Sequence, residues 1–309
     1  MLDPSDVLLR GSYVPLVTPF NDGELDLDAY AGLVDLHRQA GSDGVVVCGT
    51  SGEPGTLTLG ERMRLAEAAV EAADGGLPVI VASGALALAE SIELTRHAEK
   101  IGASAAMVVT PYYLLPPERG VIEYYRRVAD ASSLPLVVYH IPRRTGLTLS
   151  IGTIDAIAAV CPTLAGIKHS SADLGLVSDL VATFGSDFRI LGGLEDLSLP
   201  MLVLGASGVV SAVGNIAPRL VAQLCQAVGG GDLELAKRVH YRLLDLNKAV
   251  FWDTNPIAVK YMLRSLGILE RNEHRPPMAA ATPELAARLD AALAAAGITD
   301  AFATEPTAP

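Results

Sequence analysis

Residues 164–171 read LAGIKHSS, in which a charged side chain directly follows an apolar run. Residues 164–167 form a continuous apolar run, which is typical of a parallel strand covered on both faces. Lys168 follows directly, although a long charged side chain is rarely buried. The chain has only 23 Lys and Arg residues, and a structural reason to place one of them at the end of a buried strand is not evident.

Eight apolar runs of this kind recur along the 309 residues, with helical patterns between them. They are YVPLVT (13–18), GVVVC (44–48), PVIVA (78–82), AAMVVT (105–110), PLVVYH (135–140), LAGIK (164–168), FRILG (188–192) and GVVSAV (208–213). Eight β-α units in succession predict an α/β fold, the (β/α)₈ TIM barrel, with its active site on loops after the strands. A doubly wound open sheet is the main alternative, but GxGxxG does not follow the first run.

The segments between and after these runs predict helices. Residues 26–41 show apolar spacing typical of a helix, and residues 60–73 are rich in Ala and Glu. Residues 217–297 have a helical pattern throughout, although one helix is enough to finish a barrel. We therefore expect a barrel over 1–230, a C-terminal helical extension over 231–300, and a disordered tail over 301–309.

Composition and charge exclude several classes of protein. The formal net charge of −12, without a basic run, argues against a nucleic-acid partner. Half of the residues are apolar, yet no stretch approaches the roughly 20 apolar residues that cross a bilayer. The first residues carry early acids and no signal-peptide core, so we expect a soluble cytoplasmic protein without a membrane partner. Cys48, Cys161 and Cys225 lack metal or disulfide spacing and are expected to be buried thiols.

On this map, Lys168 closes the sixth strand at the catalytic end of the barrel. Desolvation there favours a neutral amine, which attacks ketones and aldehydes to give a Schiff base. Tyr139 closes the neighbouring fifth strand, where a phenol could pass protons to and from the amine. A lysine that extends its ammonium into solvent and a tyrosine that packs at the rim remain the alternatives.

Other groups at the same end could bind a substrate. The turn GTSGEPGT (49–56) offers the hydroxyls and N–H groups of Thr50 and Ser51 to a carboxylate, although such a turn is often only a turn. Arg143 and Arg144 follow the fifth strand and suit bidentate capture of a carboxylate, or else are simply solvated. His140 and His169 lack the HExxH spacing or any other typical of a metal site.

Together these pieces resemble the dihydrodipicolinate synthase and N-acetylneuraminate lyase family of pyruvate-dependent class I aldolases. The resemblance covers nearly the whole chain and rests on the order and spacing of its motifs. These are GSYVPLVTPF (11–20), GTSGE (49–53), VVTPYY (108–113), VVYHIPRRTG (137–146), GIKHSS (166–171), GVVSAVGN (208–215) and NPIAVKYML (255–263). RTG at 144–146 is most similar to the synthases, which bind the carboxylate of aspartate semialdehyde at this point.

The resemblance implies a role for each matching residue. Lys168 would form the imine with pyruvate or another 2-oxo acid, and Tyr139 and Thr50 would relay protons. Tyr113 matches a tyrosine that reaches into a neighbouring subunit's site, and the assembly would be a homotetramer built from dimers. The substrate-binding residues would be Thr50, Ser51, Arg144, Gly193 and Val210. No metal or organic cofactor would be needed, because the lysine itself supplies the electron sink.

Departures from the synthase pattern leave the second substrate open. His140 and His169 stand where asparagine and glutamate are common, so we expect the walls of the site to differ in polarity. Leu194, within GGLED (192–196), takes the place of an acid. The chain could therefore be an aldolase or dehydratase for 2-keto-3-deoxy sugar acids, 4-hydroxy-2-oxoglutarate or N-acetylneuraminate. A non-catalytic paralogue that binds a small molecule is the alternative of another class.

Overall fold

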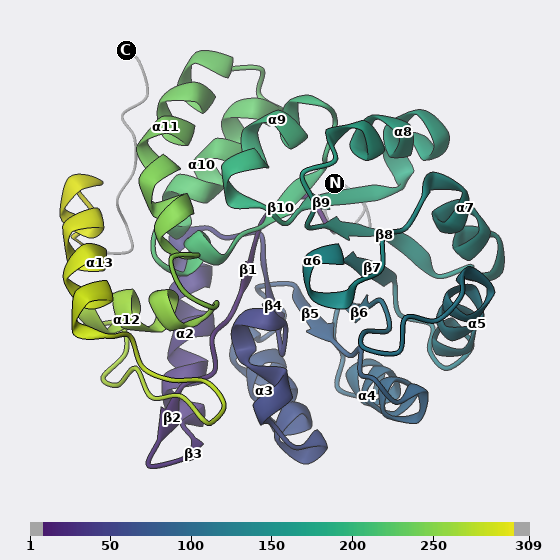
Figure 1. The fold of residues 1–309 in the computed structure, drawn as a ribbon, viewed down its shortest axis with the longest axis horizontal. Coiled ribbons are helices and arrows are strands. Elements are labelled where there is room, and N and C mark those ends of the chain that lie inside the picture. The colour runs from purple at the N-terminus through teal and green to yellow at the C-terminus, as the bar shows by residue number, and fades with distance from the viewer. Residues whose placement is uncertain (1–8, 300–309) are drawn as a thin grey trace.

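Eight parallel strands close into a barrel surrounded by helices, as Figure 1 shows for a computed structural model that describes residues 9–299. Each strand pairs with the next in chain order, and the last pairs with the first. The barrel strands are β1 (Gly11–Pro15), β4 (Gly44–Val47), β5 (Val79–Ala82), β6 (Ala105–Val109), β7 (Leu136–His140), β8 (Leu164–His169), β9 (Arg189–Gly192) and β10 (Gly208–Val210). The TIM-barrel prediction is confirmed.

Every apolar run of the sequence overlaps one barrel strand, and the two outermost runs differ in extent. The first run was placed at 13–18, but β1 ends at Pro15. The last was placed at 208–213, but β10 ends at Val210 and a 3₁₀ turn, Ala212–Asn215, follows. Both runs continue as apolar loops at the mouth of the barrel, which periodicity alone does not distinguish from strand.

Helices cover the outside of the barrel, and several of them begin at a side chain that caps them. Asp26 accepts the N–H of Ala29, and Thr58 forms a capping box with Glu61. The helices up to the eighth strand are α2 (Leu27–Ala40), α3 (Leu59–Ala73), α4 (Leu88–Lys100), α5 (Glu118–Ala129), α6 (Pro142–Thr145), α7 (Ile151–Val160), α8 (Leu174–Phe184) and α9 (Ser198–Val203). A short hairpin that was not predicted, β2 (Phe20–Asn21) with β3 (Glu24–Leu25), precedes α2.

The C-terminal part contains α10 (Pro218–Gly229), which completes the barrel, followed by α11 (Leu233–Ala249), α12 (Ile257–Ser265) and α13 (Pro283–Ala295). The last three lie together on one side of the barrel (Figure 1). Their apolar side chains, such as Leu243, Met262 and Leu289, share one buried core with strand and helix residues of the barrel. The barrel and the C-terminal helices therefore pack against each other continuously across the predicted boundary near residue 230.

The prediction of helix throughout 217–297 is wrong for residues 250–256 and for residues 266–282, which contain no regular element. Pro276 and Pro277 lack the N–H that a helix needs. Lys260 donates to the backbone carbonyl of Glu273, and the side chains of His274 and Arg275 bond to groups on the barrel. The backbone is thus shaped by these contacts rather than by a helical repeat. The predicted tail at 301–309 lies outside the described residues.

Two further expectations concern buried thiols and membranes. Cys48, Cys161 and Cys225 are all free and buried, as predicted. Burial raises the pKa of the Cys48 thiol to about 11. Across residues 9–299, every helix is too short or too polar to span a lipid bilayer.

Candidate active site

Lys168 and Tyr139 lie side by side at the carboxyl ends of β8 and β7. The two residues are direct partners in the parallel register. Lys168 is 5% exposed, and its Nζ lies 4.2 Å from the centroid of the Tyr139 ring. Tyr139 belongs to the apolar cluster that fills the barrel, so both side chains point into the interior rather than onto the helices. The structure therefore brings an amine and a phenol together at the catalytic end of the barrel.

Thr50 completes this group from the loop after β4, which lies three strands away from β7 in the barrel. It begins a 3₁₀ turn, Thr50–Gly52, and its Oγ1 lies 3.2 Å from the Tyr139 hydroxyl. Either oxygen can donate, so a proton can pass in both directions between them. Ser51 is the next residue of the turn, and the first N–H groups of a helical turn have no partner within it.

A cavity of about 370 Å³ opens beside this group. Thr50, Tyr139 and Arg144 line it, together with Tyr112. Lys168 lies behind the Tyr139 ring and is not itself a lining residue, and the same holds for Ser51, Gly193 and Val210. Tyr113, the tyrosine that the sequence singled out, is not among the lining residues and is 85% exposed. Within one chain, the loop after β6 therefore turns Tyr112 towards the site and Tyr113 away from it.

The two arginines after β7 also separate. Both are exposed on α6, but Arg144 lines the cavity and Arg143 is not among the lining residues. A guanidinium at the cavity wall can hold a carboxylate with two parallel hydrogen bonds. Arg144 is thus the arginine placed to meet an anionic substrate. Leu194, at which the sequence departs from the synthases, is likewise absent from the cavity wall.

His140 and His169 do not form walls of the site, which corrects the expectation from sequence. Successive side chains on a strand point to opposite faces, so these residues face the helices while Tyr139 and Lys168 face the interior. Their Nδ1 atoms lie 3.2 Å apart. The N–H of Leu149 donates to His140 Nε2, and His169 Nε2 lies 3.0 Å from the carbonyl oxygen of Asp173.

This chain of hydrogen bonds fits a pair of neutral imidazoles. His140 accepts at Nε2, so its Nδ1 carries the proton that it shares with His169. Burial lowers the pKa of His140 to about 4 and also lowers the pKa of His169. The pair fixes β7 and β8 against each other directly behind the reactive side chains.

Gly193, which follows β9, leaves the space that Lys168 occupies. A Cβ at this position would lie 3.0 Å from Lys168 Cε and 2.0 Å from Ser170 Oγ. Ser170 Oγ is buried and has no hydrogen-bond partner among the described residues. Any side chain at position 193 would therefore clash with Ser170 and press against the lysine. Val210, which like Gly193 is expected to bind the substrate, is the last residue of β10 and is 2% exposed.

Glu195 is a buried acid near the lysine that the sequence analysis did not identify. It accepts the N–H of Ala212 with Oε1, and its Oε2 is buried without a described partner. Burial raises the pKa of Glu195 to about 7, and the Ala212 N–H and the charge of Lys168 oppose this effect only in part. The available signal was the acid within GGLED, directly after Leu194.

The raised pKa of Glu195 predicts a pH-dependent loss of stability that Glu195→Gln should remove. The folded protein holds the proton of this carboxyl more tightly than the unfolded chain does. The resulting contribution to the free energy of unfolding is complete below the unfolded pKa, near 4.3, and is lost as the pH rises through the folded pKa, about 7. Above pH 8 the wild type should therefore be less stable than the variant by up to about 3 kcal/mol. Urea unfolding of both proteins at pH 5 and pH 8.5 measures the difference. Identical pH slopes for the two proteins would contradict the prediction.

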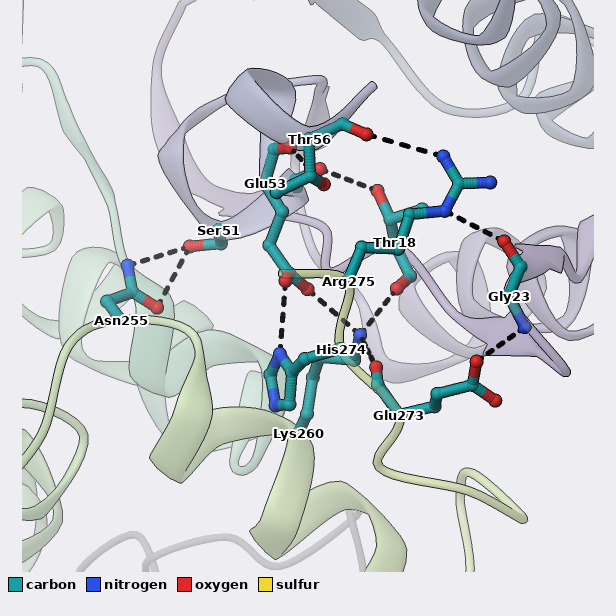
Figure 2. Close-up of polar contacts among 11 residues, drawn as sticks. Thr18, Gly23, Ser51, Glu53, Thr56, Asn255, Lys260, Glu273, His274 and Arg275 are labelled. Carbon is teal, nitrogen blue, oxygen red and sulfur yellow. Dashed lines mark hydrogen bonds and ion pairs between the residues drawn. The ribbon is translucent and has the colours of Figure 1, made fainter. Parts of the chain in front are cut away.

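Three contacts join the Thr50 turn to the C-terminal part of the chain, as Figure 2 shows. Asn255 donates to Ser51 Oγ at 3.0 Å, and Glu53 binds Lys260 and His274. Ser51 and Glu53 belong to the motif GTSGE, and Asn255 and Lys260 belong to NPIAVK. The sequence shows both motifs but gives no sign that they are in contact. Within residues 9–299 no group of three or more His, Cys, Asp or Glu side chains is placed to hold a metal ion.

The chain is similar to known proteins over nearly its whole length. The model of the dihydrodipicolinate synthetase family matches residues 8–296. The 4-hydroxy-tetrahydrodipicolinate synthase of Thermus thermophilus is 46% identical over 283 residues, which cover 91% of this chain and 94% of that protein.

Solved structures agree with this similarity. The crystal structure of dihydrodipicolinate synthase from Aquifex aeolicus has a TM-score of 0.92 at 39% identity, and covers 94% of this chain and 99% of that one. The chloride-inhibited dihydrodipicolinate synthase from Acinetobacter baumannii, complexed with pyruvate, has a TM-score of 0.90 at 33% identity, with the same shares of the two chains covered.

Proposed function

The chain belongs to the dihydrodipicolinate synthetase family, and we propose that it joins pyruvate to an aldehyde through a Schiff base on Lys168. Relatives of high coverage are named as the synthase, so an enzyme is favoured over a binding protein. The observation that carries the proposal is the line of three groups Lys168, Tyr139 and Thr50 at the mouth of the barrel. An aldolase of this class needs an amine beside a group that moves protons.

The first step is formation of the imine. The amine of Lys168 attacks the C2 carbonyl of pyruvate, and the carbonyl oxygen leaves as water after it gains protons. The Tyr139 hydroxyl can take a proton from the attacking nitrogen and give one to the leaving oxygen. Thr50 Oγ1, at 3.2 Å, holds the phenol in place and shares its proton. The product is a protonated imine, which withdraws electrons from C3.

The second step forms the carbon-carbon bond. Loss of a proton from C3 gives an enamine, whose C3 attacks the carbonyl carbon of the aldehyde while the aldehyde oxygen gains a proton. Exchange of the imine with water or with an amine of the product then frees Lys168. The imine accepts the electrons throughout, so we propose that the reaction needs no metal or organic cofactor.

Pyruvate would be held by its carboxylate at the turn after β4. The hydroxyls of Thr50 and Ser51, and the N–H groups at the start of the 3₁₀ turn, are suited to an anion beside the amine. Gly193 and Val210 would border the methyl side of the imine, where a small residue leaves room for Lys168. This arrangement would select 2-oxo acids over simple ketones.

The second substrate that we propose is aspartate semialdehyde, the substrate whose carboxylate the synthases bind at the arginine of RTG. Support comes from the position of Arg144 in the cavity wall and from relatives named as synthases. The test is to supply pyruvate with aspartate semialdehyde, and separately with other aldehydes and 2-keto-3-deoxy acids. If pyruvate is consumed or released only with another aldehyde or a 2-keto-3-deoxy acid, and not with aspartate semialdehyde, the enzyme is a sugar-acid aldolase instead.

Arg144→Ala is expected to weaken binding of the aldehyde while pyruvate binding is kept. A charge-assisted hydrogen bond contributes about 1.5 to 3 kcal/mol, so the KM for aspartate semialdehyde should rise roughly 10- to 150-fold. Steady-state kinetics with each substrate varied in turn measures both constants. Arg143→Ala is the matched control, because Arg143 is the exposed neighbour that does not line the cavity. An equal rise of this KM in the two variants would show that Arg144 does not bind the aldehyde.

We also propose that the protein assembles as a homotetramer built from dimers and acts in the cytoplasm. Tyr113 is 85% exposed, and the following Leu114 and Leu115 are 66% and 58% exposed. A loop that presents three large apolar side chains to water is typical of a surface covered by a partner. In the dimer, Tyr113 would enter the site of the other subunit.

A further inference from the structure

Glu53 is a buried acid between the carboxylate-binding turn and the C-terminal part of the chain. It follows the turn Thr50–Gly52 with a left-handed φ of 54°, and its side chain is 0% exposed. Its N–H donates to the carbonyl of Thr50 at 3.2 Å. Because Glu53 closes the turn, any movement of its backbone moves Thr50 and Ser51 as well.

Two side chains from the C-terminal part of the chain, Lys260 and His274, hold the Glu53 carboxylate, as Figure 2 shows. Lys260 Nζ lies 2.9 Å from Oε1, and His274 Nδ1 lies 3.0 Å from Oε2. All three side chains are almost completely buried. Each carboxylate oxygen therefore has its own donor, which fixes both the position and the rotation of the group.

Lys260 is itself held by the backbone on both sides of this contact. Besides Glu53, its ammonium donates to the carbonyl of Thr18 at 2.8 Å and to the carbonyl of Glu273. The three protons of the ammonium thus have three acceptors. The loop after β1, the turn after β4 and the irregular segment 266–282 meet at this one nitrogen.

A third contact from the same part of the chain reaches the turn directly. Asn255, just before α12, donates to Ser51 Oγ at 3.0 Å. Ser51 and Glu53 lie on either side of Gly52, so the turn is held both in its middle and at its end. We name Glu53, Lys260, His274 and Asn255 the clasp.

A gain in stability does not explain such an arrangement well. Removing two charges from water costs several kcal/mol per ion, and a buried ion pair often returns no more than it costs. What the contacts do provide is a single geometry. The Thr50 hydroxyl must stay 3.2 Å from Tyr139 while its turn also meets the substrate, and a 1 Å displacement at such a site can cost roughly 100-fold in rate.

We propose that Glu53, Lys260 and His274 are positioning residues, which orient Thr50 and Ser51 for the carboxylate of the 2-oxo acid. The C-terminal helices would then be a working part of the active site rather than a cover on the barrel. This inference rests on the proposed function, because it concerns the same pyruvate site. It predicts that a damaged clasp weakens capture of the 2-oxo acid and leaves recognition of the aldehyde intact.

The test compares pyruvate binding in variants of the clasp. Glu53→Gln keeps the shape of the side chain and turns one acceptor into a donor that faces another donor. His274→Leu removes one donor, and His274→Asn keeps an amide N–H close to the position of Nδ1. The pyruvate concentration for half-maximal borohydride trapping should rise about 10- to 100-fold in Glu53→Gln and His274→Leu, and return towards the wild-type value in His274→Asn. The KM for the aldehyde should stay within about twofold in all three variants.

Glu61→Gln is the matched control. It removes the ion pair of Glu61 with Arg275, at 2.7 Å, which ties the same C-terminal segment to the barrel without touching Ser51 or Glu53. Its thermal stability should fall as in the clasp variants, but its pyruvate binding should not change. If Glu53→Gln fails to fold, the two His274 variants decide the question, because they keep the pair of Lys260 with Glu53.

Three outcomes count against the inference, and they differ from a failure of the proposed function. Unchanged pyruvate trapping in folded Glu53→Gln and His274→Leu overturns it. So does an equal loss in Glu61→Gln, or an equal loss for both substrates, since each would mark a general effect on stability. If the wild type itself forms no pyruvate adduct, the proposed function and this inference both fall.

Discussion

Borohydride added with pyruvate is expected to attach one stable pyruvate-derived mass to the protein, at Lys168. The reagent reduces an imine to an amine that cannot hydrolyse, so it records the covalent intermediate directly. Lys168→Ala should remove the adduct and lower kcat by roughly 10⁴-fold or more, because no other group can take over a lost nucleophile. Peptide mass mapping of the trapped protein and steady-state kinetics measure the two results.

Lys260 provides an internal control for this experiment. It is also a buried lysine, but its ammonium donates to three acceptors beside the ring of Phe20. No hydrogen bond of the described residues involves Lys168 Nζ, which instead faces the Tyr139 ring in the interior of the barrel. A label on Lys260 in place of Lys168 would show that the nucleophile is assigned to the wrong lysine. Absence of any label in folded wild-type protein would show that the Schiff-base mechanism is wrong.

Tyr139→Phe should lower kcat by about 10²- to 10³-fold, the range of a single group that transfers protons in the rate-limiting step. Phenylalanine keeps the ring beneath the amine of Lys168 and removes only the hydroxyl that contacts Thr50. Exchange of solvent deuterium into the methyl group of pyruvate reports the imine and enamine steps without the aldehyde. It should slow by the same factor.

Two comparisons separate proton transfer from a loss of structure. Tyr125→Phe also deletes one buried phenol, whose hydroxyl donates to the carbonyl of Val108 between α5 and β6, and it should cost stability without a comparable loss of rate. Thr50→Val should slow the reaction in the same direction. The double variant Tyr139→Phe with Thr50→Val should lose less than the two losses together, because the side chains act as one unit. Strict additivity would argue against a relay.

The order of elements and the identity of the reactive lysine are properties that the sequence carries locally. Eight apolar runs with helices between them predict the barrel, because parallel strands covered on both faces need continuous apolar segments. A lysine and a tyrosine at the ends of neighbouring runs are then brought together by the register, which pairs Tyr139 with Lys168.

The direction of each side chain was less accessible to sequence. A strand that is apolar on both faces shows no alternation, so nothing distinguished the inward Lys168 from the outward His169. The same reason explains why the sequence does not show that His140 faces away from the site. In the loop after β6 the left-handed backbone at Tyr113 decides which of two adjacent tyrosines reaches the cavity, and the order of residues does not reveal it.

The barrel, the family and the central amine can all be predicted from residue order, because they depend on short patterns and their spacing. The support of the substrate turn arises only when the chain is folded. Glu53 meets Lys260 and His274 across 207 and 221 residues of chain. A charged residue in a loop usually signals a solvated surface, and only the packing of the C-terminal helices against the barrel removes these charges from water and makes them partners.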